Sequence, residues 1–182
     1  MLQTPKPKFK LRKLPLWGKV NALINFEWPT QEVMDSLPWD TALKSIKFAT
    51  STTSSYGSVA FIQCHLSNGV SSPLVSNLQQ PAQFMAKVIN FDTAERKVKM
   101  VSAIFGEGNP KVYNVIFYDK DSNIIDSYNP LHGVVNATAA DGVGEGPKHE
   151  IRENEEIVGF YGQKDQKRTF DSLGFIVSTR EF

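Results

Sequence analysis

The sequence contains few of the features that mark metal-binding, secreted or membrane proteins. Its 182 residues include one cysteine, Cys64, so no disulfide framework within the chain is predicted. No apolar run approaches the ~20 residues of a membrane span, and none near the N-terminus reaches the length of a signal peptide. We therefore expect an intracellular protein, cytoplasmic or cytoskeletal, that is not secreted and does not bind membranes. His132 and His149 have no Cys or His at metal-ligand spacing, so no metal site is predicted.

Catalytic patterns are equally scarce. Cys64 and His65 are neighbours on a predicted strand, so their side chains point to opposite faces and cannot act together. The glycine-rich stretch at 141–147 lacks the Gly-Lys-Ser/Thr that holds phosphate, and its carboxylates would repel phosphate. Carboxylates are plentiful enough to leave a glycosidase open, but no pair is marked by its spacing as acid and base. We predict a protein without enzymatic activity and without a cofactor.

Charge is unevenly distributed along the chain. The whole sequence holds 20 basic and 19 acidic side chains, a net charge of +1. Six of the basic residues precede the first acidic residue, Glu27, and the remainder of the chain has a net charge of −5. A basic arm thus precedes a mildly acidic body, and the negative charge of the body argues against nucleic-acid binding.

Residues 1–37 are predicted to form a basic, proline-containing extended arm with one short helix. Spaced prolines and alternating lysines favour extended backbone over a packed element. Thr30 before QEVMDSL predicts a capped helix that ends before Pro38.

Apolar side chains lie between the cations of this arm. The alternative interpretation is a tail that serves only solubility, but such a tail does not need apolar side chains. The pattern predicts an arm that binds a protein partner with an acidic surface, such as a cytoskeletal filament or a large complex. The residues expected to bind are Lys6, Lys8, Phe9, Lys10, Arg12, Lys13, Leu16 and Trp17.

From residue 44 onward the pattern is nearly all strand. In SVAFIQCHLSNGV alternate apolar residues share one face, and Asn68-Gly69 is a strong hairpin signal. Further strand pairs are predicted around the polar turns at 92–96, 119–123 and 152–154. Short strands separated by polar turns predict an all-β sandwich, barrel or prism of about ten to twelve strands.

The order of these segments resembles the jacalin-related lectins. EEIVGFYG followed by FDSLGFIVST is similar to the last repeat of that family, and Pro38-Trp39-Asp40 followed by residues 44–48 is similar to its opening. AFIQCHLSNGVSSPLV and KVYNVIFYDKDSNIIDSY fall in order between them. The resemblance covers residues 38–182 and implies one domain, a β-prism of three four-stranded Greek-key sheets.

The resemblance also implies a place for a sugar at one end of the prism. In that family a Gly-x-x-x-Asp loop supplies backbone donors and an accepting Asp, and a glycine-rich loop before the aromatic-Asp opening forms the other wall. Asp171 aligns with this Asp, but Lys167 stands where the glycine is expected, and EVMDSLP before Trp39 contains no glycine. The candidate carbohydrate-binding residues are Lys167, Arg168, Thr169, Phe170 and Asp171.

Two functions are compatible with these observations. Because the prism residues are retained while both sugar loops are altered, our main interpretation is a structural, protein-interaction module of a larger intracellular assembly, docked through its arm. The alternative is a carbohydrate-binding lectin with altered specificity. In that case Lys164, Lys167 and Arg168 would favour an acidic or phosphorylated sugar.

Overall fold

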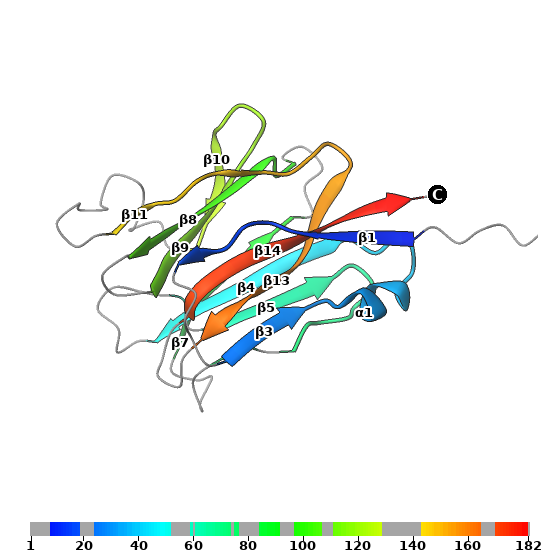
Figure 1. Cartoon of the computed structure of the whole chain (residues 1–182), viewed down its shortest axis with the longest axis horizontal. Helices are drawn as coiled ribbons and strands as arrows, with labels where there is room; N and C mark the ends of the chain where they lie inside the picture. Colours follow the sequence, from blue (N-terminus) through cyan, green and yellow to red (C-terminus); the bar gives the residue numbers. More distant parts are fainter. Residues whose placement is uncertain are drawn as a thin grey trace, which may run out of the picture.

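The computed structural model shows a nearly all-β protein with one short helix. It describes residues 8–18, 24–51, 59, 61–73, 75–76, 84–91, 97–106, 111–128, 143–164 and 170–181. The strands of these residues form three antiparallel sheets, each with a path of four hydrogen-bonded strands (Figure 1). The predicted prism of three four-stranded sheets is therefore confirmed, and two of the sheets carry one short extra strand.

The first sheet has the order β1-β14-β13-β3, with β2 beside β14; the second has the order β10-β9-β8-β11, with β12 beside β8; the third has the order β6-β5-β4-β7. In the first sheet the strands are β1 Lys8–Lys13, β2 Trp17–Gly18, β3 Ile24–Trp28, β13 Glu155–Lys164 and β14 Phe170–Glu181. In the second they are β8 Met100–Gly106, β9 Lys111–Tyr118, β10 Ile124–Ser127, β11 Val143–Glu145 and β12 His149–Glu150. In the third they are β4 Leu43–Ser51, β5 Phe61–Leu66, β6 Val75–Ser76 and β7 Phe84–Asn90.

Side chains from all three sheets meet in one core. Phe175 of the first sheet lies 5.8 Å from Phe117 of the second, measured between ring centroids, and Phe48 of the third belongs to the same cluster. Cys64 is completely buried in this core, and burial raises the pKa of its thiol. Its place on the apolar face of β5 makes Cys64 a packing residue rather than a nucleophile.

The helix α1, Gln31–Asp35, covers part of the outer face of the first sheet. The backbone N–H of Val33 donates to the side chain of Thr30 at 3.3 Å, so the predicted N-cap is confirmed. Met34 is buried in a cluster with Phe9, Val158 and Ile176. No helix among the described residues has the length and apolar character needed to cross a bilayer.

Residues 8–18 are part of the first sheet. The six residues of β1 pair with β14 from Lys8 opposite Glu181 to Lys13 opposite Ile176, so β1 and β14 lie side by side (Figure 1). Past β1, the N–H of Leu14 donates to the carbonyl of Phe175 at 2.9 Å. The expectation of extended backbone is correct, but the expectation that this segment is unpacked is wrong, because the interleaved apolar residues form the buried positions of strands. The first sheet joins residues from both sides of the expected boundary at residue 38.

Trp17 connects the first sheet to the second. Its ring stacks on His149 of β12 with the centroids 4.6 Å apart, and its indole N–H donates to the carbonyl of Pro147 at 2.9 Å. Burial lowers the pKa of His149, and a hydrogen bond with the backbone of Pro15 partly offsets this effect. Its Nε2 is buried without a hydrogen-bond partner among the described residues. The folded protein therefore favours the neutral imidazole.

We expect the protein to lose stability as the pH falls below the ordinary histidine pKa of 6.5. Within the window between the lowered pKa of folded His149 and 6.5, the unfolded chain binds more protons, so acidification favours unfolding. Thermal unfolding at a series of pH values between about 7.5 and 5.5 measures this slope around the histidine reference value. His149→Phe keeps an aromatic ring beside Trp17 and should flatten the slope. Equal slopes in the two proteins would contradict the assignment.

Candidate functional site

The first sheet has two ends of different character. At one end β13 finishes at Lys164 and β14 begins at Phe170, and the adjacent strands place Gly18 opposite Ser172 and Asn25 opposite Gln163. We call this the Asp171 end; its residues are Gly18, Asn25, Gln163, Asp171 and Ser172. At the other end lie the start of β1, the start of β13 and the end of β14.

Gly18 brings the N-terminal segment directly against Asp171. Its φ of +101° lies in the region that side-chain-bearing residues rarely adopt. A Cβ atom at this position would lie only 2.2 Å from the carbonyl oxygen of Asp171. Both facts require glycine, because any side chain would push the backbone of β2 away from β14. Gly18 and Asp171 are therefore held together by close backbone packing.

Asp171 is largely buried near the start of β14. The register of β14 against β13 shifts between Phe170 and Ser172, so Asp171 lies at a bulge of the strand. The N–H of Phe170 donates to the carbonyl of Val59 at 3.1 Å, which ties the start of β14 to the segment before β5. With 6% of its surface exposed, Asp171 is largely desolvated, and a hydrogen bond to such a carboxylate is stronger than one in water.

Further polar side chains continue across the sheet from Asp171. The hydroxyl of Ser172 is buried without a hydrogen-bond partner among the described residues. On the neighbouring strands, the exposed side-chain amide of Gln163 donates to that of Asn25 at 2.8 Å. Hydroxyl and amide groups both donate and accept hydrogen bonds, as the hydroxyls of a sugar do. Because Ser172 has no exposed surface, the amides of Gln163 and Asn25 are the groups here that can reach a neutral hydroxyl.

The structure describes two of the five predicted carbohydrate-binding residues, Phe170 and Asp171. Lys167, Arg168 and Thr169 lie outside the described residues. Phe170 has no exposed surface, and its ring centroid lies 5.0 Å from that of Phe26. Phe170 therefore does not present a surface to a ligand, because it fills the core beneath the site. The prediction that it contacts sugar is corrected to a supporting role beside Asp171.

The resemblance implies that the segment before Trp39 borders Asp171, and the contacts of the neighbouring Thr41 bear on that expectation. The carbonyl of Thr41 accepts from Arg180, near the end of β14, at 3.0 Å. Trp39 therefore lies toward the end of the first sheet opposite Asp171 and cannot border that residue. The residue that the sequence interpretation missed is Gly18. The available signal was that Gly18 is the only glycine before Gly57.

The apolar residues of the predicted partner-binding arm are occupied within the protein. Phe9 and Trp17 are buried, with 5% and 1% of their surfaces exposed. Leu16 is half-buried close to Gly174 of β14. The prediction that these side chains fill pockets on a partner is corrected for Phe9 and Trp17, because their surfaces are already covered by the sheets and the helix.

The cations of this segment also meet carboxylates of the same chain. Arg12 donates two hydrogen bonds to the buried Glu155, Nε to Oε2 at 2.8 Å and Nη2 to Oε1 at 2.6 Å, and this contact is the main reason that the pKa of Glu155 is lowered. Lys13 pairs with Glu27, and Lys10 lies 4.0 Å from Glu181. Lys8 is exposed at the start of β1, and Lys6 lies outside the described residues. For Lys10, Arg12 and Lys13, the acidic groups that this pattern predicts on a partner are carboxylates of the protein itself.

Metal-binding side chains do not cluster in the part of the chain that the structure describes. No group of three His, Cys, Asp or Glu residues there is placed to hold an ion.

Comparison with known proteins identifies the fold. No family model matches the chain, and no curated protein matches its sequence. Among solved structures, single-chain recombinant jacalin matches with a TM-score of 0.60 and 17% identity, over 93% of this chain and 95% of jacalin. A mannose-specific jacalin-related lectin from Morus nigra matches with a TM-score of 0.55 and 18% identity, over 98% and 99%. AcmJRL, a mannose-binding jacalin-related lectin from Ananas comosus, matches with a TM-score of 0.55 and 15% identity, over 92% and 96%.

These likenesses confirm the resemblance that the sequence suggested. The chain has the β-prism fold of the jacalin-related lectins, and it spans nearly the whole length of each matched chain. The matched part extends beyond residues 38–182, since 98% of this chain is covered by the lectin from Morus nigra. At these identities the likeness defines the fold, whereas ligand and activity depend on the residues of this chain.

Proposed function

We propose that the protein is a carbohydrate-binding protein that holds a sugar at the Asp171 end of the prism, without catalysing a reaction on it. The observation that carries the proposal is the contact between Gly18 and Asp171. The positive φ of Gly18 and its missing side chain let β2 pack directly against the backbone of Asp171, which places a carboxylate and the N-terminal segment together at this end of the sheet. The exposed amides of Gln163 and Asn25 extend the polar surface.

The comparisons favour this function over assembly. Two of the matched structures are named as mannose-binding lectins, and their prisms correspond to almost all of this chain. The assembly interpretation depends on an arm that is available to a partner. For the described residues of the arm, its apolar side chains and most of its cations are instead engaged by the prism. The intracellular location expected from the sequence stays a prediction.

Mannose is the first sugar to test, and the charge near the site suggests the second. Lys164 ends β13 opposite Phe170, so a cation lies at the edge of the Asp171 end. A cation there would favour a glycan that carries a carboxylate or a phosphate. A glycan array that holds both neutral mannosides and acidic glycans separates the two specificities.

Asp171→Asn tests the proposed site. The substitution keeps the size of the side chain but removes the charge, so hydrogen bonds from sugar hydroxyls are weakened and the affinity should fall at least about tenfold. The measurement is a calorimetric titration with the best sugar from the array. Asp121→Asn is the matched control, because Asp121 is an exposed aspartate in the turn between β9 and β10. Equal affinities of both variants and the wild type would contradict the assignment of the site.

A further inference from the structure

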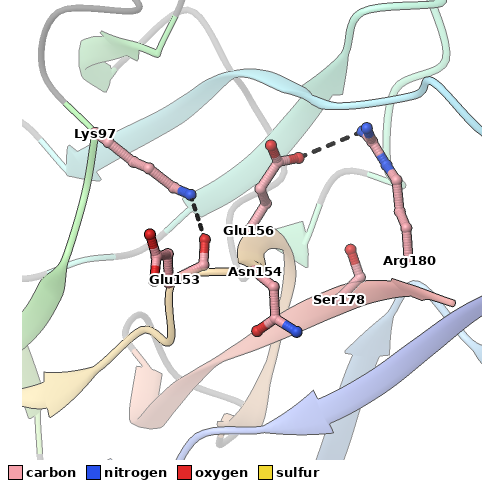
Figure 2. Close-up of a pocket in the computed structure, with 6 residues that line it drawn as sticks. All are labelled: Lys97, Glu153, Asn154, Glu156, Ser178 and Arg180. Atoms are coloured by element: carbon pink, nitrogen blue, oxygen red, sulfur yellow. Dashed lines mark hydrogen bonds and ion pairs between the residues drawn. The ribbon is translucent and has the colours of Figure 1, made fainter.

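A polar depression lies near the end of the first sheet opposite Asp171. Its volume is about 230 Å³, and the close-up in Figure 2 shows the side chains around it. They come from the segment before β8, the turn between β12 and β13, and the strands β13 and β14. The lining residues are Lys97, Glu153, Asn154, Glu156, Ser178 and Arg180. None of them belongs to the Asp171 end.

The two cations of this depression are held in place by backbone carbonyls. Lys97 donates from Nζ to the carbonyl of Glu153 at 2.6 Å, and Arg180 donates from Nη2 to the carbonyl of Thr41 at 3.0 Å. Arg180 also lies 3.5 Å from the carboxylate of Glu156 (Figure 2). Carbonyl anchors fix the positions of both cations while leaving N–H groups for further bonds, since Lys has three donors and Arg five.

Two further polar side chains line the depression, those of Asn154 and Ser178 (Figure 2). Ser178 of β14 lies opposite Glu156 of β13 in the register of the sheet. Ser178 is 5% exposed, so its hydroxyl occupies a mostly enclosed position. An amide, a hydroxyl and a carboxylate thus line the same depression, and such groups can donate and accept hydrogen bonds.

The charge and size of the depression define its ligand. Two cations and two carboxylates line it, so neither an anion nor a cation is favoured by net charge. Its volume is below the roughly 300–1,000 Å³ of sites for drug-sized molecules, which indicates a single small ring.

We propose that this depression is a second saccharide site, for one neutral sugar residue, near the end of the first sheet opposite Asp171. The inference goes beyond the proposed function, because it adds a site with different residues and does not use Asp171. It has a consequence for activity: a single chain with a site toward each end can join two glycans without forming an oligomer.

The test uses the full chain, labelled with ¹⁵N, in the Asp171→Asn background that disables the first site. Methyl α-mannoside and the methyl glycosides of other neutral monosaccharides are titrated while the signals of Asn154, Glu156 and Ser178 are followed. We expect saturable shifts of these signals with at least one sugar. Adding Glu156→Gln should weaken that binding roughly tenfold, because one charge-assisted hydrogen bond is lost. Glu181→Gln, which changes a carboxylate at the same end but outside the depression, should leave it unchanged.

The outcomes separate the two sites. Binding in the wild type that disappears completely in Asp171→Asn would support the first site and overturn the second. Binding in Asp171→Asn that is insensitive to Glu156→Gln would also overturn the second site. Because the pair of Glu156 and Arg180 is partly exposed at 3.5 Å, its removal should hardly alter stability, so loss of binding would not reflect unfolding.

Discussion

Removal of residues 1–19 is expected to prevent the protein from folding. The deletion takes away β1 and β2, and with them the buried side chains of Phe9, Leu14 and Trp17. Each such side chain contributes about 1.5–3 kcal/mol through its burial, and the cavity left in the core adds to the loss. The buried carboxylate of Glu155 would also lose its partner Arg12, which typically costs about 3–5 kcal/mol. The sum is comparable to the whole stability of a typical domain, about 5–15 kcal/mol.

Circular dichroism and urea unfolding measure this effect. Deletion of residues 1–7 is the matched control, because it leaves every residue of β1 and β2 in place and should preserve the cooperative transition. The interpretation of residues 1–37 as a tether makes the opposite prediction, namely that the prism stays folded without residues 1–19. A cooperative transition of normal amplitude in the longer deletion would therefore contradict the structure described here.

Gly18→Ala is expected to destabilise the protein and weaken its binding of sugar. The new Cβ would lie 2.2 Å from the carbonyl oxygen of Asp171, so β2 or β14 has to move. The unfavourable φ adds about 1–3 kcal/mol of strain. Either movement changes the position of Asp171 relative to Gly18, so the affinity for sugar should also fall, by about tenfold or more if one hydrogen bond is lost.

Gly69→Ala is the control that separates strain from contact. Gly69 also has a positive φ, +87°, but a Cβ there would meet no heavy atom within 4 Å. Gly69→Ala should lower the free energy of unfolding only by the backbone strain and leave the affinity for sugar unchanged. Gly18→Ala should lower the free energy of unfolding by more and also reduce the affinity. Equal destabilisation by the two substitutions would mean that the contact at Gly18 has no energetic effect.

The hairpins were predictable because their signals are local. Asn68-Gly69 predicts a turn after the strand that contains Cys64, and Gly69 has the positive φ that such a turn uses. The polar turn at 119–123 separates β9 from β10 as expected. In each case the alternation of apolar residues and the turn residues lie within a few positions of each other. The prism itself followed from the order of these segments and their resemblance to the lectins.

The role of residues 8–18 was not predictable from local pattern. A strand with one buried face and a tail with interleaved apolar anchors have the same alternation of Lys with Phe and Leu. What distinguishes them is the pairing of β1 with β14, more than 160 residues away in the sequence, from Lys13 opposite Ile176 to Lys8 opposite Glu181. The spaced prolines also favoured the prediction of an unpaired tail. Pro15 is nevertheless compatible with the sheet, because it lies between β1 and β2, where no ladder hydrogen bond is required.

The candidate site was predictable only in part, for the same reason. Asp171 could be found because its strand is similar to the last repeat of the lectins. Gly18 could not, because its contact with Asp171 depends on the pairing of β2 with β14. The polar depression near Arg180 combines residues from four separate segments, and no spacing in the sequence marks them as neighbours.

The most direct test of the proposed sugar site is a titration of the ¹⁵N-labelled wild-type chain with methyl α-mannoside. A second titration uses the acidic glycans that Lys164 would favour. We expect saturable shifts in the signals of Gly18, Gln163, Asp171 and Ser172, with the strongest effects on Gly18 and Asp171. Shifts at both Gly18 and Asp171 would show that the first residues of the chain and the last hairpin form one site. No saturable shift at the Asp171 end with any of these sugars would contradict the proposed function.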